Sequence, residues 1–444
     1  MKFKNICISS YLRVVMLIHT LLLLTTVCYG NNNAYGIKNV LHQPKIYDNF
    51  YAPSIKSVKT YRTGRDLNNP IAELNSNESI TVEFDDLSEE ATSFDYTIIH
   101  CTYSWERSDL IFMDYCDGFE YNRVEDYHSS VGTTASYVHY ALNFANSNIK
   151  LKLSGNYVVQ VVDSYDHSKV ILQQRFMVVE PILSMKALVR QPLVQDLLKT
   201  SQQVELEVNY SPLGNIDPNN DIVTVICQNN QADNSLVGIH PTYISSGNIR
   251  YTAPSALIFD GCNEYRNLDL KSFYYQTSKI QQIKSYGGEF HVSLAPDKDN
   301  RNGDYVESPD LNGKFIIKRD DSNDSQTEAE YSWVYFSLLT QRQDSADVYL
   351  YGEMTGYTLD PAYKLNFNYR NEGYELRAQL KQGYYNYRYV TVNKSTGTIS
   401  HAQLEGNHFE TENSYQVTVY YKSPGIRYWR LVGIKTISSR YSKG

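Results

Sequence analysis

Apolar and polar residues alternate along most of the chain. Between residues 204 and 210, Val204, Leu206, Val208 and Tyr210 take every second position, with Glu or Asn between them. Because successive side chains of a strand point to opposite faces, this spacing predicts a half-buried antiparallel strand. The same pattern predicts strands at Ile55–Arg62, Ser79–Phe84, Asp95–His100, Tyr157–Val162, Val170–Val179, Ile222–Cys227, Lys314–Lys318, Val348–Tyr351, Tyr385–Tyr389 and Tyr415–Tyr421.

Turn-forming residues separate these segments, as at Ser154-Gly155-Asn156 and Leu311-Asn312-Gly313. No segment has a convincing amphipathic helical pattern, and Pro192 interrupts the partial one in Met185–Gln203. Many short strands joined by turns are typical of β-sandwiches. The predicted fold class is all-β, with tandem antiparallel β-sandwich domains of immunoglobulin-like or early-set-like type that follow a signal peptide.

Two interruptions divide the predicted strands into domains. Glu180-Pro181 follows a long apolar strand, and a proline there would end strand pairing. Residues 319–330 (RDDSNDSQTEAE) contain no apolar residue larger than Ala, which predicts an exposed linker. The predicted domains are a signal peptide at 1–30, a first sandwich at 37–180, a second at 181–318, the linker at 319–330 and a third sandwich at 331–440.

The N-terminal segment has the pattern of a secretory signal. Lys2, Lys4 and Arg13 precede an apolar stretch at Val14–Val27, and small residues at 28 and 30 suit cleavage before Asn31. The stretch is shorter than the roughly 20 apolar residues of a membrane-spanning helix. Lipidation of Cys28 is an alternative, which Thr25 and Val27 make less suitable. We expect a mature protein outside the cytoplasm.

Composition and charge narrow the classes of partner. Tyr is unusually frequent, with 40 residues against 15 Phe and 3 Trp, which suits strands and polar aromatic surfaces. The net charge is −8; without residues 1–30, 38 basic residues stand against 49 acidic ones, which gives −11. No cluster of Lys or Arg is present, so binding to nucleic acid through its phosphates is not expected.

The cysteines and histidines offer few metal ligands. A site built from His100 or Cys101 with Cys116 and His139 is disfavoured, because adjacent strand residues point to opposite faces. Cys227 and Cys262 complete the four cysteines after the signal peptide. Local disulfides Cys101–Cys116 and Cys227–Cys262, other pairings and buried free thiols all remain open.

Known catalytic patterns are missing from the sequence. It has no nucleophile elbow, zinc-protease motif or glycine-rich phosphate loop. The acid pairs Asp85-Asp86 and Glu89-Glu90 fall in a predicted surface loop. A glycosidase pair formed by two carboxylates that are far apart in the chain stays open as an alternative. Residues 297–308 have some features of a calcium loop but do not fit its pattern. Arg301, Asn302 and Ser308 stand where such a loop needs a ligand, a glycine and a glutamate. We therefore expect a hairpin or solvent-exposed loop there, and no catalytic, cofactor-binding or metal-binding residue is predicted.

The third domain carries a possible surface for sugars. Tyr385, Tyr387 and Tyr389 share one strand face, which we expect to pack in the core, and residues 384, 386 and 388 form the other face, which we expect to be displayed. The strand sequences resemble the early-set sandwich of glycogen-binding modules, which bind glucans through exposed Trp. Here Trp333 is expected in a core strand at Tyr331–Phe336 and Trp429 near an edge, so no sugar platform is evident.

A series of short motifs, in a fixed order, resembles the type IX secretion system plug protein family. The resemblance covers nearly all of the chain after the signal peptide, and it depends on the number and order of motifs that are individually weak. These motifs are Val58–Tyr61, Val82–Leu87, His100-Cys101 with Trp105 and Ser108, Gly118-Phe119, Asp126-Tyr127, Tyr137–Tyr140, Ser154–Tyr157, Cys227–Asn229, Phe259, Asn263–Arg266, Leu380–Gly383, Glu405–Asn407, Glu410–Asn413 and Tyr415.

The resemblance implies a non-enzymatic periplasmic protein with no cofactor. Such a plug would close the periplasmic opening of the large outer-membrane β-barrel translocon, its partner, and would not insert into the membrane itself. A wide barrel leaves an aqueous lumen that must be blocked when no cargo passes. The sequence does not identify partner-binding residues. The alternative is a secreted carbohydrate-binding or cell-surface β-sandwich protein.

Overall fold

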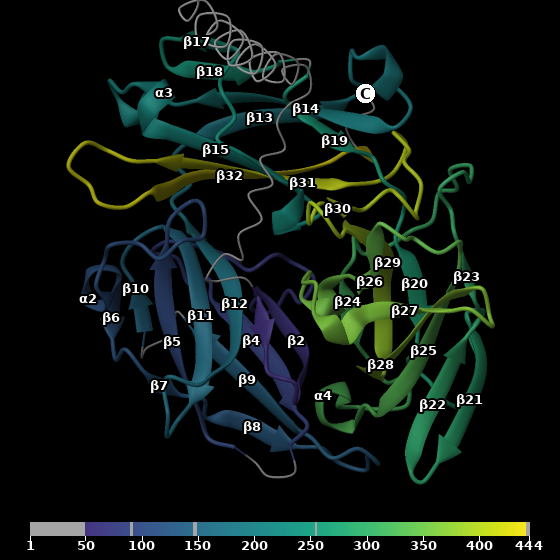
Figure 1. Cartoon of the computed structure of the whole chain (residues 1–444). Helices are drawn as coiled ribbons and strands as arrows, with labels where there is room; N and C mark the ends of the chain where they lie inside the picture. The colour runs from purple at the N-terminus through teal and green to yellow at the C-terminus, as the bar shows by residue number, and fades with distance from the viewer. Residues whose placement is uncertain (1–48, 89–91, 145–148, 254, 441–444) are drawn as a thin grey trace, which may run out of the picture.

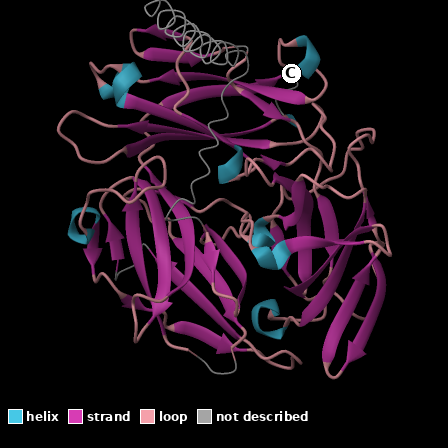
Figure 2. Cartoon of the chain, in the orientation of Figure 1, coloured by secondary structure: helices cyan, strands magenta, loops and turns pink. Residues whose placement is uncertain are grey.

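The chain folds into three β-sandwiches, shown in a computed structural model that describes residues 49–88, 92–144, 149–253 and 255–440. Strands dominate the described residues and helices are single turns, which confirms the predicted all-β fold class (Figure 2). The second sandwich lies across the other two, so the three bodies occupy the corners of a triangle (Figure 1). The predicted signal peptide at 1–30 and the Glu89-Glu90 pair lie outside the described residues.

The first sandwich is formed by strands that are close in sequence. One sheet has the order β1-β12-β11-β5-β7, with β3 added beside β12, and the other has the order β2-β4-β9-β8. A small β10-β6 pair covers one side. The elements are β1 (Phe50–Tyr51), β2 (Ile55–Arg62), β3 (Ile71–Glu73), β4 (Ile80–Asp86), β5 (Phe94–Cys101), α2 (Phe112–Tyr115), β6 (Cys116–Gly118), β7 (Asn122–Arg123), β8 (Asp126–Ser129), β9 (Val138–Phe144), β10 (Ile149–Leu151), β11 (Gly155–Asp163) and β12 (Val170–Val179).

Alternation along these strands explains the core of the first sandwich. Phe84 and Tyr140 stack at 5.1 Å between their ring centroids, and Tyr157 stacks on Phe176 at 5.2 Å. All four side chains are buried in one apolar cluster between the two sheets. Burial of this aromatic surface is the main stabilising contribution.

The second sandwich draws its strands from two distant parts of the chain. One sheet has the order β13-β14-β18-β17, with β19 beside β14, and the other has the order β16-β15-β31-β32. Its elements are β13 (Ser184–Arg190), η1 (Gln195–Leu197), β14 (Ser201–Asn209), η2 (Ser211–Leu213), α3 (Pro218–Asp221), β15 (Ile222–Gln228), η3 (Ala232–Asn234), β16 (Ser235–Val237), β17 (Tyr243–Ser245), β18 (Asn248–Tyr251), β19 (Ile258–Asp260), β31 (Ser414–Tyr421) and β32 (Arg430–Ser438).

The third sandwich is one continuous sheet in the order β20-β29-β26-β27-β28-β25-β22-β21, with β23, β24 and β30 added at its sides. Residues from both ends of this path share one buried cluster, so the sheet folds over on itself. Its elements are β20 (Arg266–Asp269), β21 (Ile280–Tyr286), β22 (Glu289–Leu294), β23 (Asp297–Lys298), β24 (Phe315–Ile317), α4 (Ser325–Glu328), β25 (Tyr331–Leu339), β26 (Ala346–Tyr351), η4 (Glu353–Thr355), η5 (Pro361–Tyr363), β27 (Lys364–Asn368), β28 (Gly373–Lys381), β29 (Gly383–Asn393) and β30 (Ile399–Ser400).

These pairings move the predicted boundaries of the second and third domains. Strands β20 and β24, assigned by sequence to the second domain, pair with β29 of the third sandwich. Strand β31, assigned to the third domain, pairs with β15 of the second sandwich over Ile222–Gln228. The boundary at residue 318 was wrong for these strands because local alternation shows where a strand lies but not which strand it pairs with.

The predicted linker is also corrected. Residues 325–330 form α4 and its exit, and Glu330 is buried against the first sandwich, where it accepts hydrogen bonds from the backbone N–H groups of Thr134 and Ala135. Tyr137 donates to the carbonyl oxygens of Gln326 and Ala329. Residues 319–324 are mostly exposed, as predicted, whereas residues 325–330 form part of an interface with the first sandwich.

The two faces of β29 are both covered. Tyr385, Tyr387 and Tyr389 lie in the core, as their alternation predicts. The opposite face is not displayed, because Arg388 is buried with its guanidinium carbon 3.6 Å from the centroid of the Tyr265 ring. Tyr265 belongs to a segment far away in sequence, which the local pattern could not place.

Candidate functional site

The residues considered for a metal site are not brought together. His100 lies on β5 with Nδ1 2.9 Å from Ser108 Oγ, whereas His139 lies on β9 of the opposite sheet with Nδ1 2.7 Å from Asp85 Oδ1. Within the described ranges, no group of three or more His, Cys, Asp or Glu side chains is arranged to hold a metal ion.

The four cysteines among the described residues are thiols, so neither sequence-local disulfide is formed. Burial raises the pKa of the Cys101 thiol and of the Cys116 thiol to about 12 and that of Cys227 to about 11. A thiol with a raised pKa holds little of the reactive thiolate at neutral pH. The geometry therefore assigns Cys101, Cys116 and Cys227 to packing and not to nucleophilic chemistry.

The segment that was compared with a calcium loop begins with a carboxylate that already has several partners within the protein. Asp297 is buried and accepts hydrogen bonds from Lys279, Tyr387 and Tyr389, and Arg266 lies 3.2 Å away. These cationic partners hold the pKa of Asp297 below its usual value against the effect of burial. This carboxylate ties the β22–β23 region to the core of the third sandwich.

A second buried carboxylate joins the first and third sandwiches. Asp85 was predicted in a surface loop, but it lies on β4 with no exposed surface. Its Oδ2 accepts hydrogen bonds from Lys381 Nζ at 2.6 Å and from the Tyr331 hydroxyl at 2.7 Å, both in the third sandwich. Burial alone would raise the pKa of Asp85, but Lys381 and His139 lower it. The group is an ionised carboxylate locked between two sandwiches.

The other two junctions are also polar and buried. Between the first and second sandwiches, the Tyr420 hydroxyl donates to Asn156 Oδ1 at 2.8 Å, and Arg430 pairs with Glu180 at 2.5 Å. Between the second and third, Asp233 accepts from the Tyr351 hydroxyl at 2.7 Å and lies 2.8 Å from His401 Nε2. Directional hydrogen bonds at every junction fix the relative orientation of the three bodies.

A cavity of about 660 Å³ lies where the three sandwiches meet. Its walls combine the Arg62–Glu78 ion pair, the amides of Asn69, Asn229, Asn230 and Asn312, the Lys314 amine and apolar side chains such as Ile71 and Ile434. The Lys314 amine donates to Asn69 Oδ1 at 2.8 Å and to the Leu67 carbonyl oxygen, so it serves the junction itself.

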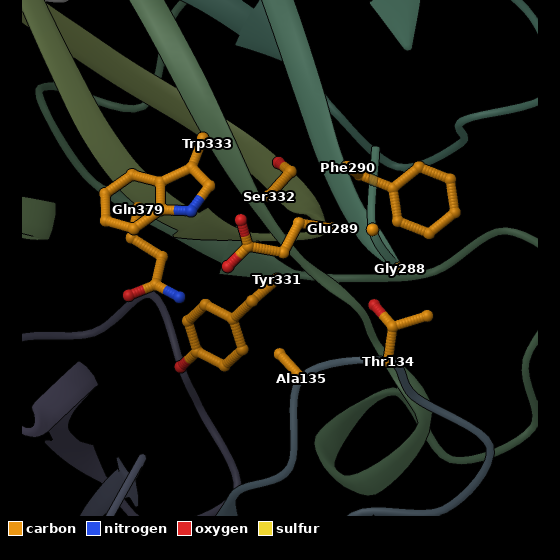
Figure 3. Close-up of a pocket in the computed structure, with 10 residues that line it drawn as sticks. Thr134, Ala135, Gly288, Glu289, Phe290, Tyr331, Ser332, Trp333 and Gln379 are labelled. Carbon is orange, nitrogen blue, oxygen red and sulfur yellow. The ribbon is translucent and has the colours of Figure 1, made fainter. Parts of the chain in front are cut away.

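A smaller pocket of about 120 Å³ lies between the first sandwich and the outer face of the third (Figure 3). Trp333, expected in the core, lies half-buried on this outer face, with the Arg377 guanidinium 3.9 Å from its ring centroid. Trp333 lines the pocket with Gln379, Glu289 and Thr134. Alternation explains the correction, because Val334 and Phe336 take the core face of β25.

Comparison with known proteins gives the family. The family model "Type 9 secretion system plug protein 1st domain" matches residues 55–180, from the first residue of β2 to the residue after β12. The chain is also similar to a crystal structure of a hypothetical protein from Parabacteroides merdae, with 32% identity and a TM-score of 0.86; the match covers 89% of this chain and 100% of that one. The chain belongs to the type 9 secretion system plug protein family. No curated protein matches it.

Membership in the plug family agrees with the resemblance seen in the sequence motifs. Several of these motifs lie at the junctions: Val82–Leu87 contains Asp85, and Leu380–Gly383 contains Lys381. Sequence reasoning missed Lys381 and Glu330 as junction residues, because a single Lys in a strand and a Glu in a polar stretch carry no sign of burial. Among the described residues, no helix is both long and apolar enough to cross a membrane.

Proposed function

We propose that the chain is a non-enzymatic plug that docks on the periplasmic opening of the outer-membrane translocon barrel of the type 9 secretion system and seals it at rest. The observation that carries this proposal is membership in the plug family. The chain would reach the periplasm after removal of residues 1–30 and associate with the outer membrane only through the barrel.

The geometry supports a blocking role. A seal must resist deformation, and the three sandwiches are joined by buried charged and hydrogen-bonded contacts such as Lys381–Asp85 and Tyr420–Asn156. Among the described residues, the Cys101, Cys116 and Cys227 thiols are used in packing, and the Asp85 and Asp233 carboxylates are used at the junctions. A rigid body of three sandwiches is suited to covering an opening wider than a single domain.

This proposal is tested by purifying the tagged chain, in mild detergent, from its native envelope. We expect a very large outer-membrane barrel protein to co-purify at near one-to-one stoichiometry, as identified by mass spectrometry. We also expect the chain to reduce the conductance of that barrel in a planar bilayer when added from the periplasmic side. Purification of the chain alone, or with polysaccharide only, would contradict the plug function.

Carbohydrate binding is the second candidate function, and the pocket at Trp333 is the observation that favours it. Trp333, the Gln379 amide and the Thr134 hydroxyl line the pocket, and these polar groups have no hydrogen-bond partner among the described residues. An aromatic ring beside such groups is suited to a sugar ring. The pocket is smaller than the roughly 300–1,000 Å³ of typical small-molecule sites, so it would hold only a single ring.

Sedimentation with insoluble glucan separates the two candidates. Carbohydrate binding predicts that the chain sediments and that Trp333→Ala remains in the supernatant. The plug function predicts that both proteins remain in the supernatant.

A further inference from the structure

Large apolar side chains are exposed on the segment from α2 to β7, at the side of the first sandwich that is turned away from the third (Figure 1). In the segment from α2 to β7, the exposed fraction is 67% for Ile111, 75% for Met113, 78% for Phe119 and 38% for Tyr121. Single exposed apolar residues are common, but a contiguous group usually marks an interaction site. We call residues 111–123 the outer strip.

Short-range contacts hold the segments of the outer strip to one another. Lys152 Nζ donates to the Met113 carbonyl oxygen at 2.8 Å and lies 3.2 Å from Asp117, so it links the α2 turn to β6. Asn122 Nδ2 donates to the Phe119 carbonyl oxygen at 2.7 Å. These bonds hold the backbone in place while the apolar side chains of Met113 and Phe119 face solvent.

The strip continues onto the neighbouring turn between β11 and β12. The Tyr121 ring stacks on His167 with 3.9 Å between their centroids, and Arg123 donates to Ser164 Oγ at 2.8 Å. Tyr165 on that turn is 90% exposed. The surface is therefore wider than one loop.

The surroundings of the outer strip are acidic. Residues 106–126 hold seven carboxylates and two arginines, a net charge of −5 where the whole chain has −8. Arg427 pairs with Asp114 and Lys152 pairs with Asp117. Four carboxylates have no ion-pair partner among the described residues: Glu106, Asp109, Glu120 and Glu125.

We propose that the outer strip is the face by which the chain docks on its protein partner. The partner would present apolar side chains that cover Met113 and Phe119, surrounded by basic residues that match the acidic border. This inference deepens the proposed function and depends on it: the surface that fits the strip is a basic, partly apolar part of the periplasmic rim of the translocon barrel.

The acidic charge around the outer strip favours a basic protein surface over other binding partners. An anionic lipid surface or a nucleic acid would be repelled by the carboxylates around the strip. A second copy placed on the strip by two-fold symmetry would bring two segments of net charge −5 together, which disfavours self-association.

The experiment measures binding of the full chain to detergent-purified translocon barrel by biolayer interferometry. We expect the double variant Met113→Ser/Phe119→Ser to weaken binding at least tenfold, because it removes two anchors at the centre of the strip. Both residues are exposed, so an unchanged circular dichroism spectrum and thermal midpoint are expected. The matched control is Tyr274→Ser/Val306→Ser, which replaces two equally exposed side chains of the third sandwich (83% and 71%) and should bind like wild type.

Charge variants test the acidic border separately. We expect Glu120→Gln/Glu125→Gln to slow association several-fold at low salt and to reduce its salt dependence. If wild type and the Met113/Phe119 variant bind the barrel equally well, the docking face is wrong and the plug function stands. If wild type does not bind the barrel, the plug function fails, and the docking face fails with it.

Discussion

At the residue scale, buried charged side chains specify how parts of this protein fit together. Lys381 and Asp85 have almost no exposed surface, and each is also hydrogen-bonded, Lys381 to the Gln326 carbonyl oxygen and Asp85 to Tyr331. A buried ion pair gains little over apolar packing, but removal of one partner leaves an uncompensated charge. The pair therefore specifies how the first and third sandwiches meet.

Replacement of Lys381 by Met should destabilise the chain by about 3–5 kcal/mol, because Asp85 would remain buried without its cation. Urea unfolding at pH 7 measures the change. The control is Lys394→Met, which removes an exposed pair with Asp347 at 3.7 Å and should cost less than about 1 kcal/mol. Equal effects of the two substitutions would contradict a structural role for the buried pair.

His100 makes stability depend on pH. Burial lowers the pKa of His100 to about 4, from about 6.5 in the unfolded chain, so the unfolded state binds the extra proton between these values. Stability should fall as pH decreases from 6.5 to 4, by about 3 kcal/mol from this residue, since each pKa unit is worth about 1.4 kcal/mol.

The variant His100→Gln should show a shallower loss of stability over this pH range, measured by urea unfolding at several pH values. His128→Gln, at an exposed position, is the control and should keep the wild-type slope. His100 also explains the glycine in Ser154-Gly155-Asn156: a Cβ at Gly155 would lie 2.6 Å from His100 Nε2, and Gly155 has φ +146°. A parallel slope for wild type and His100→Gln would contradict this prediction, because it would mean that His100 has the same pKa in the folded and unfolded states.

At the scale of elements, the sequence predicted individual strands but not which strands pair with one another. Alternation predicted β2 and β12 with their observed bounds, and it placed Val204, Leu206, Val208 and Tyr210 on a buried face. The pairing partners of the strands could not be predicted from local sequence. For example, β15 and β31 are neighbours although 187 residues separate Gln228 from Tyr415. The junction pair was missed for the same reason: 296 residues separate Asp85 from Lys381.

A fragment of residues 181–318 should not fold alone. It lacks β31 and β32, and it carries β20, β22, β23 and β24, each of which pairs with a strand outside the fragment. Residues 181–260 joined to 414–440 through a flexible Gly/Ser linker should restore a cooperative urea transition, because this chain contains both sheets of the second sandwich. The fragment 49–180 is the positive control, since all of its strands pair among themselves. Cooperative unfolding of 181–318 would contradict the strand pairing.

The whole molecule is three sandwiches that contact one another pairwise. The Asp85–Lys381, Glu180–Arg430 and Asp233–Tyr351 contacts close a triangle, so rotation of any one sandwich breaks polar contacts with two others. Domain interfaces within one chain often allow relative motion, but here each is partly buried and charged. The molecule should behave as one rigid body.

Calorimetry tests this rigidity. We expect one thermal transition for the full chain, and Lys381→Met should move the whole transition to a lower temperature. Arg430→Met, at a different junction, should move the same transition. Two separate transitions, of which each variant shifts only one, would show that the sandwiches unfold independently.

The return of β31 and β32 to the second sandwich has a consequence for the order in which the protein is made. Chains emerge from a ribosome or an export channel N-terminus first, and domains usually fold as they emerge. The first sandwich is complete once residue 179 has emerged, but β15 waits for residues 414–438 before its sheet can close. Until then the backbone edge of β15 has no partner on this side. A half-emerged chain therefore needs protection from aggregation through this open edge, and the finished triangle forms only in the last step.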